Sequence, residues 1–497
     1  MTDRSSSPRS AADRRSGRTP SGAWAGFGAA AAALAVAIVI RLLTGVPSGM
    51  ERVAEAITIL VPVALFDALL SIFGTLAKPG LVLAVAIGVL AGGAGIGWLA
   101  ARGKRRGRAI GVAAGLVALF GIGLPLLLRH PDTALAGIPA VLVYIGLFAN
   151  AYDPAAAPNA EADESRRKLL QWGAVLGVLL IAGGLLSRLL SGGGRLIAGA
   201  LPPTITPDDE FYVVSKNLID PSIVLATWRL KVGGLVAQPM ELTLEALRAL
   251  GSVEQLQTLE CISNEVGGNL ISTARWRGVP LTRVLARARP SGAVVELKLT
   301  SEDGYSESIP LAMAADERVL LAFEMNGAPL PEKHGFPLRL LLPGVYGMKG
   351  PKWLSGIEAV DEPYDGYWEQ RGWTKQALIK TMSRLDAPAS NAALPLRATP
   401  IGLAGIAFAG DRGIERVELQ IGEGADWVAA ALDPLPPGDV KAGVWRFWRY
   451  AWRPSRAGTY ALRVRAIDGS GAIQSAQVSD TLPDGASGYD GTSYTIS

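Results

Sequence analysis

The strongest constraint on the fold is a set of long apolar segments, all of which lie before residue 200. A helix needs about 20 mostly apolar residues to cross a bilayer. Five segments reach or approach that length: 22–44, 80–101, 109–128, 134–151 and 169–190. We therefore predict an N-terminal α-helical membrane domain over residues 22–191 with about five transmembrane helices, preceded by a disordered cytoplasmic tail over residues 1–21.

A further apolar segment, residues 53–77, contains Glu55, Pro62 and Asp67, so it can either cross the bilayer or lie at its interface. The positive charges predict the orientation, because cytoplasmic loops are enriched in Lys and Arg. The densest basic loops are 102–108 and 165–168. With five crossings, both loops and the tail lie in the cytoplasm, and the chain beyond the last segment lies outside. A sixth crossing would move only the N-terminus outside.

Two short motifs in this region have more than one interpretation. The stretch SRRKLLQWGAVLGVLLIAGG (165–184) resembles a twin-arginine export signal, and an ordinary basic flank explains it equally well. GGAGIG (92–97) lies inside an apolar segment with no preceding strand, which favours close helix packing over a dinucleotide loop. The five predicted spans contain no histidine, so they lack the pairs that hold b-type haem. We assign this domain no role beyond anchoring.

The chain from residue 192 onward reads as a soluble protein. Residues 192–208, which contain Gly-Gly-Gly and all but the last residue of LPPTITPDD (201–209), are predicted to be a linker. Strand and helix patterns then alternate: TWRLKVGGLV is a strand with a Gly-Gly turn, LTLEALRAL has helical spacing, AVVELKLTSEDGYSESIPL is strand, turn, strand, and FPLRLLLPG is a strand that ends at a turn. This pattern predicts one α+β domain over residues 209–385.

A second soluble domain is predicted over residues 395–482, followed by a tail over 483–497. The stretches IERVELQI, VWRFWRYAWRP and GTYALRVRAIDGSG alternate in polarity and are separated by turn residues. This pattern is typical of an immunoglobulin-like β-sandwich. Its aromatic residues are expected in the core or an interface, with ligand binding through exposed rings as the alternative: Trp445, Phe447, Trp448, Tyr450 and Trp452.

Cys261 is the only cysteine in 497 residues, which excludes a disulfide framework, a cysteine-based zinc site and an iron–sulfur cluster. It follows the strand-like QLQTLE and precedes a polar loop, so we expect it to be more accessible than a core cysteine. Three interpretations stay open: a buried small hydrophobe, a soft metal ligand and a nucleophile.

Other residue counts exclude further functions. Two histidines, His130 and His334, are too few for a histidine metal site or a bis-histidine haem. The net charge is +4, and the basic residues cluster beside apolar segments, which indicates membrane orientation and no nucleic-acid partner.

Several motifs occur in an order that resembles the sulfite oxidase family of molybdenum-cofactor enzymes. They are FYVVSKN (211–217), TLECISNEVGG with ISTARWRGVPL (258–281), SEDGYSESIPL (301–311) and MNGAPLPEKHGFPLRLLLPGVYGMKGPKWL (325–354), followed by the terminal β domain. The resemblance covers about residues 205–480. It implies a sulfite-oxidase-like molybdopterin domain, oxidoreductase activity and Mo-molybdopterin as the cofactor.

The resemblance also implies the site residues. Cys261 matches the family cysteine whose thiolate binds molybdenum. His334 and Arg339 match a family His and Arg that grip the cofactor, and an arginine can bind phosphate in bidentate fashion. The other implied cofactor-binding residues are Tyr212, Ser215, Lys216, Asn217, Asp303, Gly347, Met348, Lys349 and Lys352.

Two departures from the family concern the substrate. Animal and plant sulfite oxidases have NRR after the cysteine, whereas this chain has NEV, with Glu265 and Val266. A carboxylate there should repel sulfite, unless Glu265 only donates or accepts hydrogen bonds in support of the site. The stretch YWEQRGW places Trp373 at the family's active-site tyrosine. Cys261, Glu265 and Trp373 are therefore the candidate catalytic residues.

The sequence thus predicts a membrane-anchored molybdopterin-dependent oxidoreductase that transfers an oxygen atom to or from a small sulfur- or nitrogen-containing substrate. A haem-binding Cys-x-x-Cys-His motif is absent from the chain, so we expect a separate cytochrome or quinone-linked partner to exchange the electrons. Two alternatives remain: a reductase that repairs oxidised methionine or other S-oxides, and a non-catalytic extracytoplasmic binding protein on the same fold. The resemblance also implies a possible homodimer.

Overall fold

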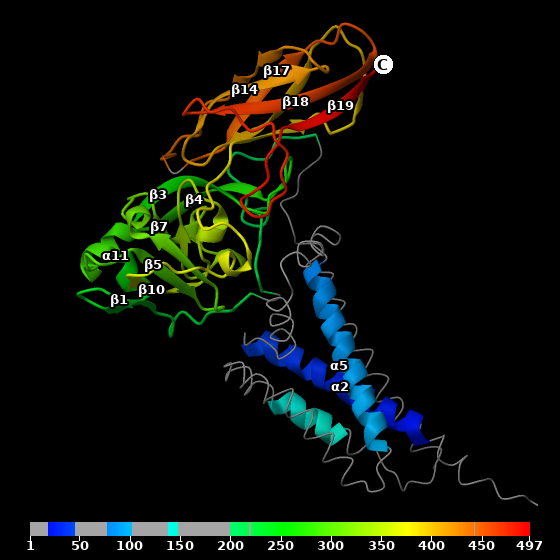
Figure 1. The fold of residues 1–497 in the computed structure, drawn as a ribbon, viewed down its shortest axis with the longest axis vertical. Coiled ribbons are helices and arrows are strands. Elements are labelled where there is room, and N and C mark those ends of the chain that lie inside the picture. The colour runs from blue at the N-terminus through cyan, green and yellow to red at the C-terminus, as the bar shows by residue number, and fades with distance from the viewer. Residues whose placement is uncertain (1–17, 45–76, 102–137, 148–198, 218–219, 442) are drawn as a thin grey trace, which may run out of the picture. The chain divides into compact units, whose positions relative to one another are not determined.

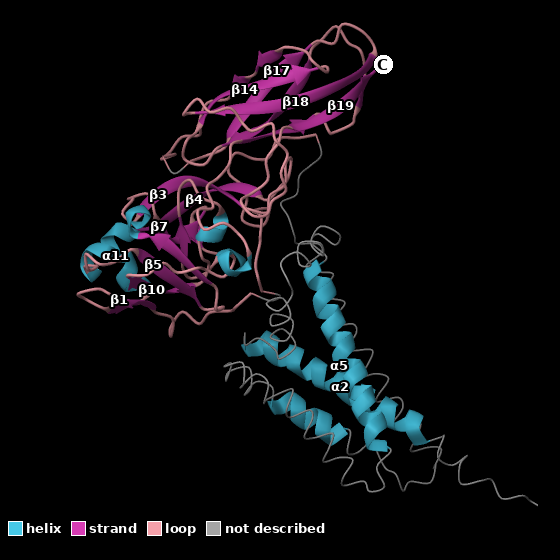
Figure 2. Cartoon of the chain, in the orientation of Figure 1, coloured by secondary structure: helices cyan, strands magenta, loops and turns pink. Residues whose placement is uncertain are grey.

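The computed structural model describes residues 18–44, 77–101, 138–147, 199–217, 220–441 and 443–497. The chain divides into two compact units, residues 1–191 and 192–497, and we describe each unit by itself (Figure 1). The first unit is helical in its described part, whereas the second is built mainly of strands (Figure 2).

The first unit contains the helices α2 (Arg18–Thr44) and α5 (Ala77–Ala101) and a shorter helix over Ile138–Leu147. These helices correspond to the apolar segments predicted at 22–44, 80–101 and 134–151. The predicted spans at 109–128 and 169–190 lie outside the described residues, as does nearly all of 53–77. Within the described part, one segment, Ala23–Ile40, is long and apolar enough to cross a bilayer, as a membrane anchor or a signal sequence would be.

Glycines bring α2 and α5 into close contact. A Cβ atom on Gly26 would lie 2.1 Å from the carbonyl oxygen of Gly93, and one on Gly93 would lie 2.5 Å from the Cβ of Ala30. Only glycine therefore fits at these positions. The Tyr144 hydroxyl donates to the Gly93 carbonyl oxygen at 3.5 Å. This packing confirms the prediction that GGAGIG serves a close helix contact.

The second unit begins with a five-stranded sheet in the order β2–β1–β10–β5–β6. Its strands are β1 (Leu230–Gly234), β2 (Met240–Leu242), β5 (Glu296–Ser301), β6 (Ser306–Pro310) and β10 (Leu354–Val360). The short helices α10 (Leu244–Arg248), α11 (Leu281–Ala288) and α12 (Leu311–Ala314) accompany them. Apolar residues from this sheet and from α10 and α11 form one core.

A second sheet carries the site. Its strands are β3 (Val253–Glu260), β4 (Ile271–Pro280), β7 (Leu320–Met325) and β8 (Ala328–Pro329), in that order, with β9 (Arg339–Leu341) paired to β7. Strand β3 lies between two cores: Leu259 packs with Trp276 on β4, whereas Leu256 packs with Phe408 and Trp445 from the C-terminal part of the chain. Burial on both faces explains why QLQTLE lacks a solvent-facing row.

The C-terminal β-rich region consists of two sheets in the orders β11–β13–β17–β16 and β12–β19–β18–β14–β15. The strands are β11 (Met382–Ala387), β12 (Ala393–Leu394), β13 (Ile401–Phe408), β14 (Ile414–Ile421), β15 (Trp427–Ala429), β16 (Ala431–Leu432), β17 (Arg446–Trp452), β18 (Gly458–Asp468) and β19 (Asp490–Ile496). Residues of both sheets share one core, in which Trp448 and Trp452 are buried. The expectation of core aromatics is confirmed for these two residues and for Trp445.

The expected tail over residues 483–497 is wrong. Strand β19 pairs along its length with β18, and Tyr494 is fully buried. The stretch DGTSYTI has few large apolar residues, so its sequence reads as a tail. Its pairing with a long neighbouring strand, and not its own hydrophobicity, makes it part of the sheet.

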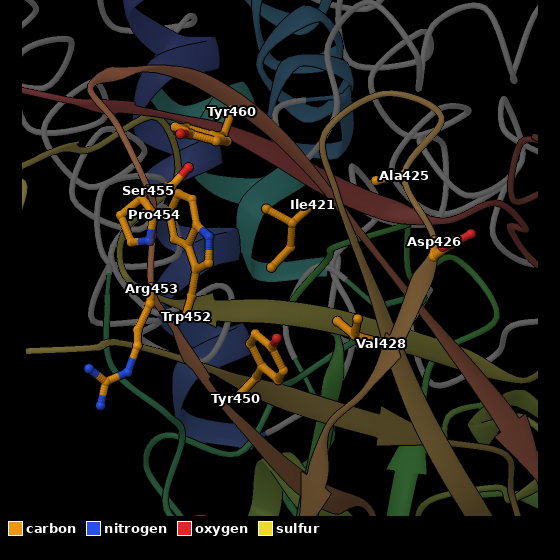
Figure 3. Close-up of a pocket in the computed structure, with 10 residues that line it drawn as sticks. All are labelled: Ile421, Ala425, Asp426, Val428, Tyr450, Trp452, Arg453, Pro454, Ser455 and Tyr460. Carbon is orange, nitrogen blue, oxygen red and sulfur yellow. The ribbon is translucent and has the colours of Figure 1, made fainter.

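The β-rich region also contains a cavity of about 380 Å³. Tyr450 and Trp452 on β17 and Tyr460 on β18 form an aromatic wall, with Arg453 and Asp426 nearby (Figure 3). None of the predicted cofactor-binding residues lines this cavity.

Candidate functional site

Cys261 comes directly after β3 and opens a loop that closes back on itself. Its amide donates to the carbonyl oxygen of Leu270 at 2.9 Å, and its own carbonyl accepts from the amide of Asn264 at 2.9 Å. The Sγ atom lies 3.0 Å from the hydroxyl of Ser263. Because the loop folds over it, Cys261 is only 8% exposed, and the expectation of an accessible thiol is wrong.

Tyr212 connects the cysteine to the glycine turn. Its amide donates to the Ser272 hydroxyl at 3.2 Å, which ties the segment to β4. A Cβ atom on Gly347 would lie 2.9 Å from the Tyr212 hydroxyl, so a side chain at 347 would displace the ring. Burial raises the pKa of Tyr212 well above its usual value, and the nearby Cys261 raises it further, whereas Arg339 lowers it. Tyr212 thus packs with Cys261 in one core and contacts the glycine turn at Gly347.

Arg339 begins β9 and is buried, with 6% of its surface exposed. One guanidinium nitrogen donates to the His334 carbonyl oxygen at 3.1 Å, and the group lies 5.2 Å from the Trp276 ring centroid. Burial lowers the Arg339 pKa to about 10. Among the described residues no carboxylate pairs with Arg339, and its Nε has no hydrogen-bond partner. A buried guanidinium with an unused N–H fits an anionic group such as the cofactor phosphate.

His334 lies at the end of the short 3₁₀ helix η3 (Glu332–His334) and is buried. Its Nε2 lies 2.8 Å from the Asp208 carbonyl oxygen, and Phe211 packs edge-on against its ring. Burial lowers the His334 pKa to about 3, so the imidazole is neutral at pH 7 and donates through Nε2.

The segment 215–217 meets the turn after β5. The Lys216 ammonium donates to the Asn217 side-chain oxygen at 2.9 Å and to the Asp303 backbone oxygen at 2.8 Å. The Asn217 amide group donates to the Asp303 carboxylate at 2.9 Å. Ser215 instead donates to Asp220 at 2.7 Å. Three of the predicted residues, Lys216, Asn217 and Asp303, thus form one cluster.

Lys349 lies in the 3₁₀ helix η4 (Gly347–Lys349) and is almost completely buried. Its ammonium lies 2.5 Å from a Glu307 oxygen and 2.6 Å from a Glu369 oxygen. Burial raises the Glu307 pKa to about 7, and Lys349 opposes that rise. In the same turn, the Met348 carbonyl accepts from the Tyr305 hydroxyl at 2.7 Å. The charge of Lys349 is thus compensated inside the protein.

The other predicted residues lie toward the periphery. Lys352 donates to the Lys333 carbonyl oxygen at 3.0 Å, and its ammonium lies 4.3 Å from the Trp353 ring centroid. Glu265 is exposed, and Trp373 is partly buried against the core that contains Ile262 and Met348. Glu265 is therefore an outward-facing charge on the cysteine loop.

Sequence reasoning missed the buried carboxylate nearest to the cysteine. Glu260, the last residue of β3, accepts from the Asn264 side chain at 2.9 Å, and its second oxygen has no hydrogen-bond partner in the described part of the chain. Burial raises its pKa to about 7. Its place at a strand end beside Cys261 was visible in the sequence, but a strand pattern of that kind does not predict burial of a glutamate.

Comparisons with known proteins place this site in a family. Residues 217–368 match the oxidoreductase molybdopterin binding domain. Chicken sulfite oxidase is 31% identical over 323 residues, which cover 54% of this chain and 68% of the chicken protein. The chain belongs to the sulfite oxidase family of molybdopterin-dependent oxidoreductases. Mo-molybdopterin is the cofactor of this family, and the buried Arg339, whose Nε has no hydrogen-bond partner among the described residues, fits it.

Other relatives in the sulfite oxidase family agree. Human mitochondrial sulfite oxidase is 32% identical over 314 residues, which cover 54% of this chain and 57% of the human protein. The chain thus spans little more than half the length of that relative. The uncharacterized oxidoreductase YuiH of Bacillus subtilis is 31% identical over 176 residues, 87% of its length and 35% of this chain. The sulfane dehydrogenase SoxCD structure from Paracoccus pantotrophus shares the fold, with 22% identity and a TM-score of 0.50 over 59% of this chain and 81% of that one.

Proposed function

We propose that this protein is a membrane-anchored molybdopterin oxidoreductase that transfers an oxygen atom to or from a small sulfur compound. One observation carries the proposal: the only cysteine packs in one core with Trp276, and a buried arginine that has no carboxylate partner among the described residues lies 5.2 Å from the centroid of that same Trp276 ring. Thiolate sulfur suits molybdenum, and an uncompensated guanidinium suits an anion.

Each residue has a separate task in this proposal. Cys261 is the molybdenum ligand, and Arg339 binds the cofactor's anionic end. Neutral His334 orients the loop that precedes Arg339 through its contact with the Asp208 carbonyl. Lys216, Asn217 and Asp303 form a polar wall for the pterin. The bound cofactor supplies the two-electron oxygen-transfer chemistry, and the protein supplies the ligand, the position and the electrostatics.

The substrate proposal depends on the cysteine loop. Glu265 and Val266 are exposed on this loop, at the positions where animal and plant sulfite oxidases have two arginines. A carboxylate and an apolar side chain disfavour a doubly charged anion, so we propose a neutral sulfur compound in preference to sulfite. Exposure of Val266 also favours a second candidate, the reduction of S-oxides such as oxidised methionine. Trp373, which packs against the core that contains Ile262, is proposed to border the substrate site at this loop.

The membrane arrangement is part of the proposal. We propose a multi-pass anchor in the lipid bilayer with the catalytic domain outside the cytoplasm, on the basis of the apolar segments and of the basic loops at 102–108 and 165–168 in the sequence. We further propose that a separate cytochrome or quinone-linked partner exchanges electrons with the site. The two-sheet core supports an immunoglobulin-like sandwich, which we propose as the homodimer contact.

Metal and pterin analysis of the purified full-length protein tests the catalytic proposal. We expect about one molybdenum per chain in the wild type and loss of activity in Cys261→Ser, because oxygen is a harder ligand than thiolate. Wild-type protein that contains no molybdenum, although the producing cells supply the cofactor, would refute the proposal and favour a non-catalytic binding protein. Assays with sulfite, neutral thioethers and S-oxides then identify the substrate class.

The orientation requires its own test. A periplasmic reporter fused after Ser191 should be active, and a matched cytoplasmic reporter at the same position should be inactive. The opposite result would refute the extracytoplasmic location without affecting the cofactor assignment.

A further inference from the structure

The cysteine loop is held by a residue from the C-terminal β-rich region. Arg384 on β11 donates from Nη1 to the Gly268 carbonyl oxygen at 2.5 Å. The arginine is buried, and its Nε donates to an Asp386 oxygen at 2.7 Å. Asp386 therefore fixes the direction in which the guanidinium reaches the loop.

A second contact from the same region meets the neighbouring glycine. Gly267 has a φ of +74°, and a Cβ atom there would lie 2.9 Å from an Asp490 oxygen. The other oxygen of Asp490 accepts from the Leu385 amide at 2.9 Å, so Asp490 is anchored beside Arg384. The backbone at 267–268 thus fits against the buried Arg384 and the partly buried Asp490, and only glycine allows that approach.

The held carbonyl is connected to the cysteine through the loop's own hydrogen bonds. The Gly268 amide donates to the Glu265 carbonyl oxygen, and a Cβ atom on Gly268 would lie 2.6 Å from the Asn264 side-chain oxygen. That Asn264 oxygen accepts from the Leu270 amide at 2.8 Å, and the Leu270 carbonyl accepts from the Cys261 amide at 2.9 Å. Movement of Gly268 would therefore disturb both ends of the loop.

Charge complementarity also favours this placement of Arg384. The Asp386 side chain, which accepts from the Arg384 Nε at 2.7 Å, is as buried as the arginine, with 4% of its surface exposed. Burial raises the pKa of Asp386 to about 6 and also raises that of the partly buried Asp490, and Arg384 opposes both rises. One guanidinium thus binds the Asp386 carboxylate and one loop carbonyl, with Asp490 held on the neighbouring Leu385 amide. Such an arrangement fixes the guanidinium more strongly than a single surface pair would.

We propose that Arg384 is a positioning residue: from the β-rich region it fixes the 261–270 loop and thereby the direction of the Cys261 thiol. The β-rich region then contributes to the cofactor site without touching the metal. The link to catalysis rests on the proposed function. The competing explanation is that Arg384 only stabilises the β-rich region itself.

Thiol labelling separates these two explanations, because Cys261 is the only cysteine in the chain and every labelled thiol reports this loop. Full-length protein produced without the cofactor is treated with iodoacetamide under native conditions. A buried thiol reacts through local opening, so its labelling rate follows the opening equilibrium. We expect Arg384→Met to accelerate labelling roughly tenfold to a hundredfold, the range that follows from losing one charged hydrogen bond.

Arg412→Met is the matched control. Arg412 also belongs to the β-rich region, where it donates to Asp468 at 2.9 Å and to the Ile379 carbonyl oxygen at 3.0 Å. It has no hydrogen bond to residues 261–270 in the described structure. Its labelling rate should equal that of the wild type. Equal acceleration in both variants would overturn the proposal, because a general loss of stability would then explain the effect.

Arg384→Lys provides a conservative variant should Arg384→Met fail to fold. A lysine can reach Asp386 or the Gly268 carbonyl but cannot hold both in the arginine geometry. We expect an intermediate labelling rate, and a wild-type rate in a folded Arg384→Lys protein would overturn the proposal. Molybdenum content in cofactor-producing cells is measured separately. Its absence from the wild type would refute the proposed function and leave the labelling result intact.

Discussion

Two buried cations of the catalytic domain, Arg339 and Lys349, are in opposite electrostatic situations. Both were predicted from the sequence to meet the cofactor. Lys349 lies within 2.6 Å of carboxylate oxygens of Glu307 and Glu369. Arg339 pairs with no carboxylate among the described residues, and its Nε has no hydrogen-bond partner. Both cations are therefore buried, but only the charge of Lys349 is neutralised by neighbouring carboxylates.

This difference indicates what each cation is for. A buried charge is costly unless it is paired, so an unpaired one fits a site whose partner arrives with a ligand. A cation between two carboxylates already has its partners and holds protein segments together. Glu307 lies on β6 and Glu369 on the 3₁₀ helix η5 (Glu369–Arg371), so Lys349 ties both to the glycine turn. Its implied role in cofactor binding stays a prediction.

The largest effect is expected when the compensated cation is removed. Lys349→Met leaves two buried carboxylates without a cation and should lower the free energy of unfolding by about 3–5 kcal/mol at pH 7. Burial already raises the pKa of Glu307 and Lys349 opposes that rise, so in the variant Glu307 must bind a proton to stay buried and the deficit should shrink as the pH falls. Denaturant unfolding at pH 7 and pH 5 measures both quantities.

A triple variant controls for that experiment. Adding Glu307→Gln and Glu369→Gln to Lys349→Met removes the stranded charges and should recover most of the lost stability. If the triple variant recovers no stability, the loss in Lys349→Met does not come from the broken ion pairs. A loss in Lys349→Met below about 1 kcal/mol, the range of surface pairs, would contradict the comparison itself.

Removal of Arg339, the cation without a carboxylate partner among the described residues, should not destabilise the protein. Arg339→Met should lower molybdenum retention by at least about tenfold, since a charged contact to the cofactor is lost. The cofactor-free protein should be unchanged or more stable, because an unpaired buried charge has been replaced by an apolar group. Metal analysis and the unfolding midpoint of the cofactor-free protein test this pair of outcomes. Marked destabilisation without metal would mean that Arg339 has a structural partner.

The neutral histidine beside Arg339 should make the protein acid-sensitive. The His334 pKa is about 3 in the folded protein, below its unfolded value of about 6.5, so the unfolded state binds the extra proton first. Stability should therefore fall as the pH drops from about 6.5 toward 3, by about 2 kcal/mol between pH 7 and 5. His334→Gln, which cannot titrate, should show a flatter pH dependence over that window. An identical slope in wild type and variant would exclude His334 as the cause.

The smallest effect is expected for the exposed charge on the cysteine loop. Glu265→Gln should change the free energy of unfolding by less than about 0.5 kcal/mol, because the side chain is in solvent. If the carboxylate disfavours anionic substrates, the variant should lower KM for an anion and leave KM for a neutral thioether unchanged. Equal changes for both substrates would show that Glu265 does not act through its charge.

Much of the fold was predictable from local patterns. The strand pair β5 and β6, the helical spacing of α10, and the strands β14, β17 and β18 all lie within the stretches whose periodicity predicted them. Strand β19 was not predictable, because its stretch is polar and becomes a strand only through pairing with β18. The accessibility of Cys261 was mispredicted for a related reason, since the loop covers it through hydrogen bonds that no sequence pattern reveals.

The sequence by itself determined that the site has one thiol and that the order of its motifs matches the family. It also showed that the long apolar segments all lie before residue 200. Only the tertiary structure decided how those groups are used. In the described structure, Arg339 has no carboxylate partner and Lys349 pairs with two carboxylates. Glu265 is exposed to solvent. The physical reason is that charge compensation and burial depend on residues distant in sequence. Glu307 and Arg384 reach their partners only after the sheets have packed.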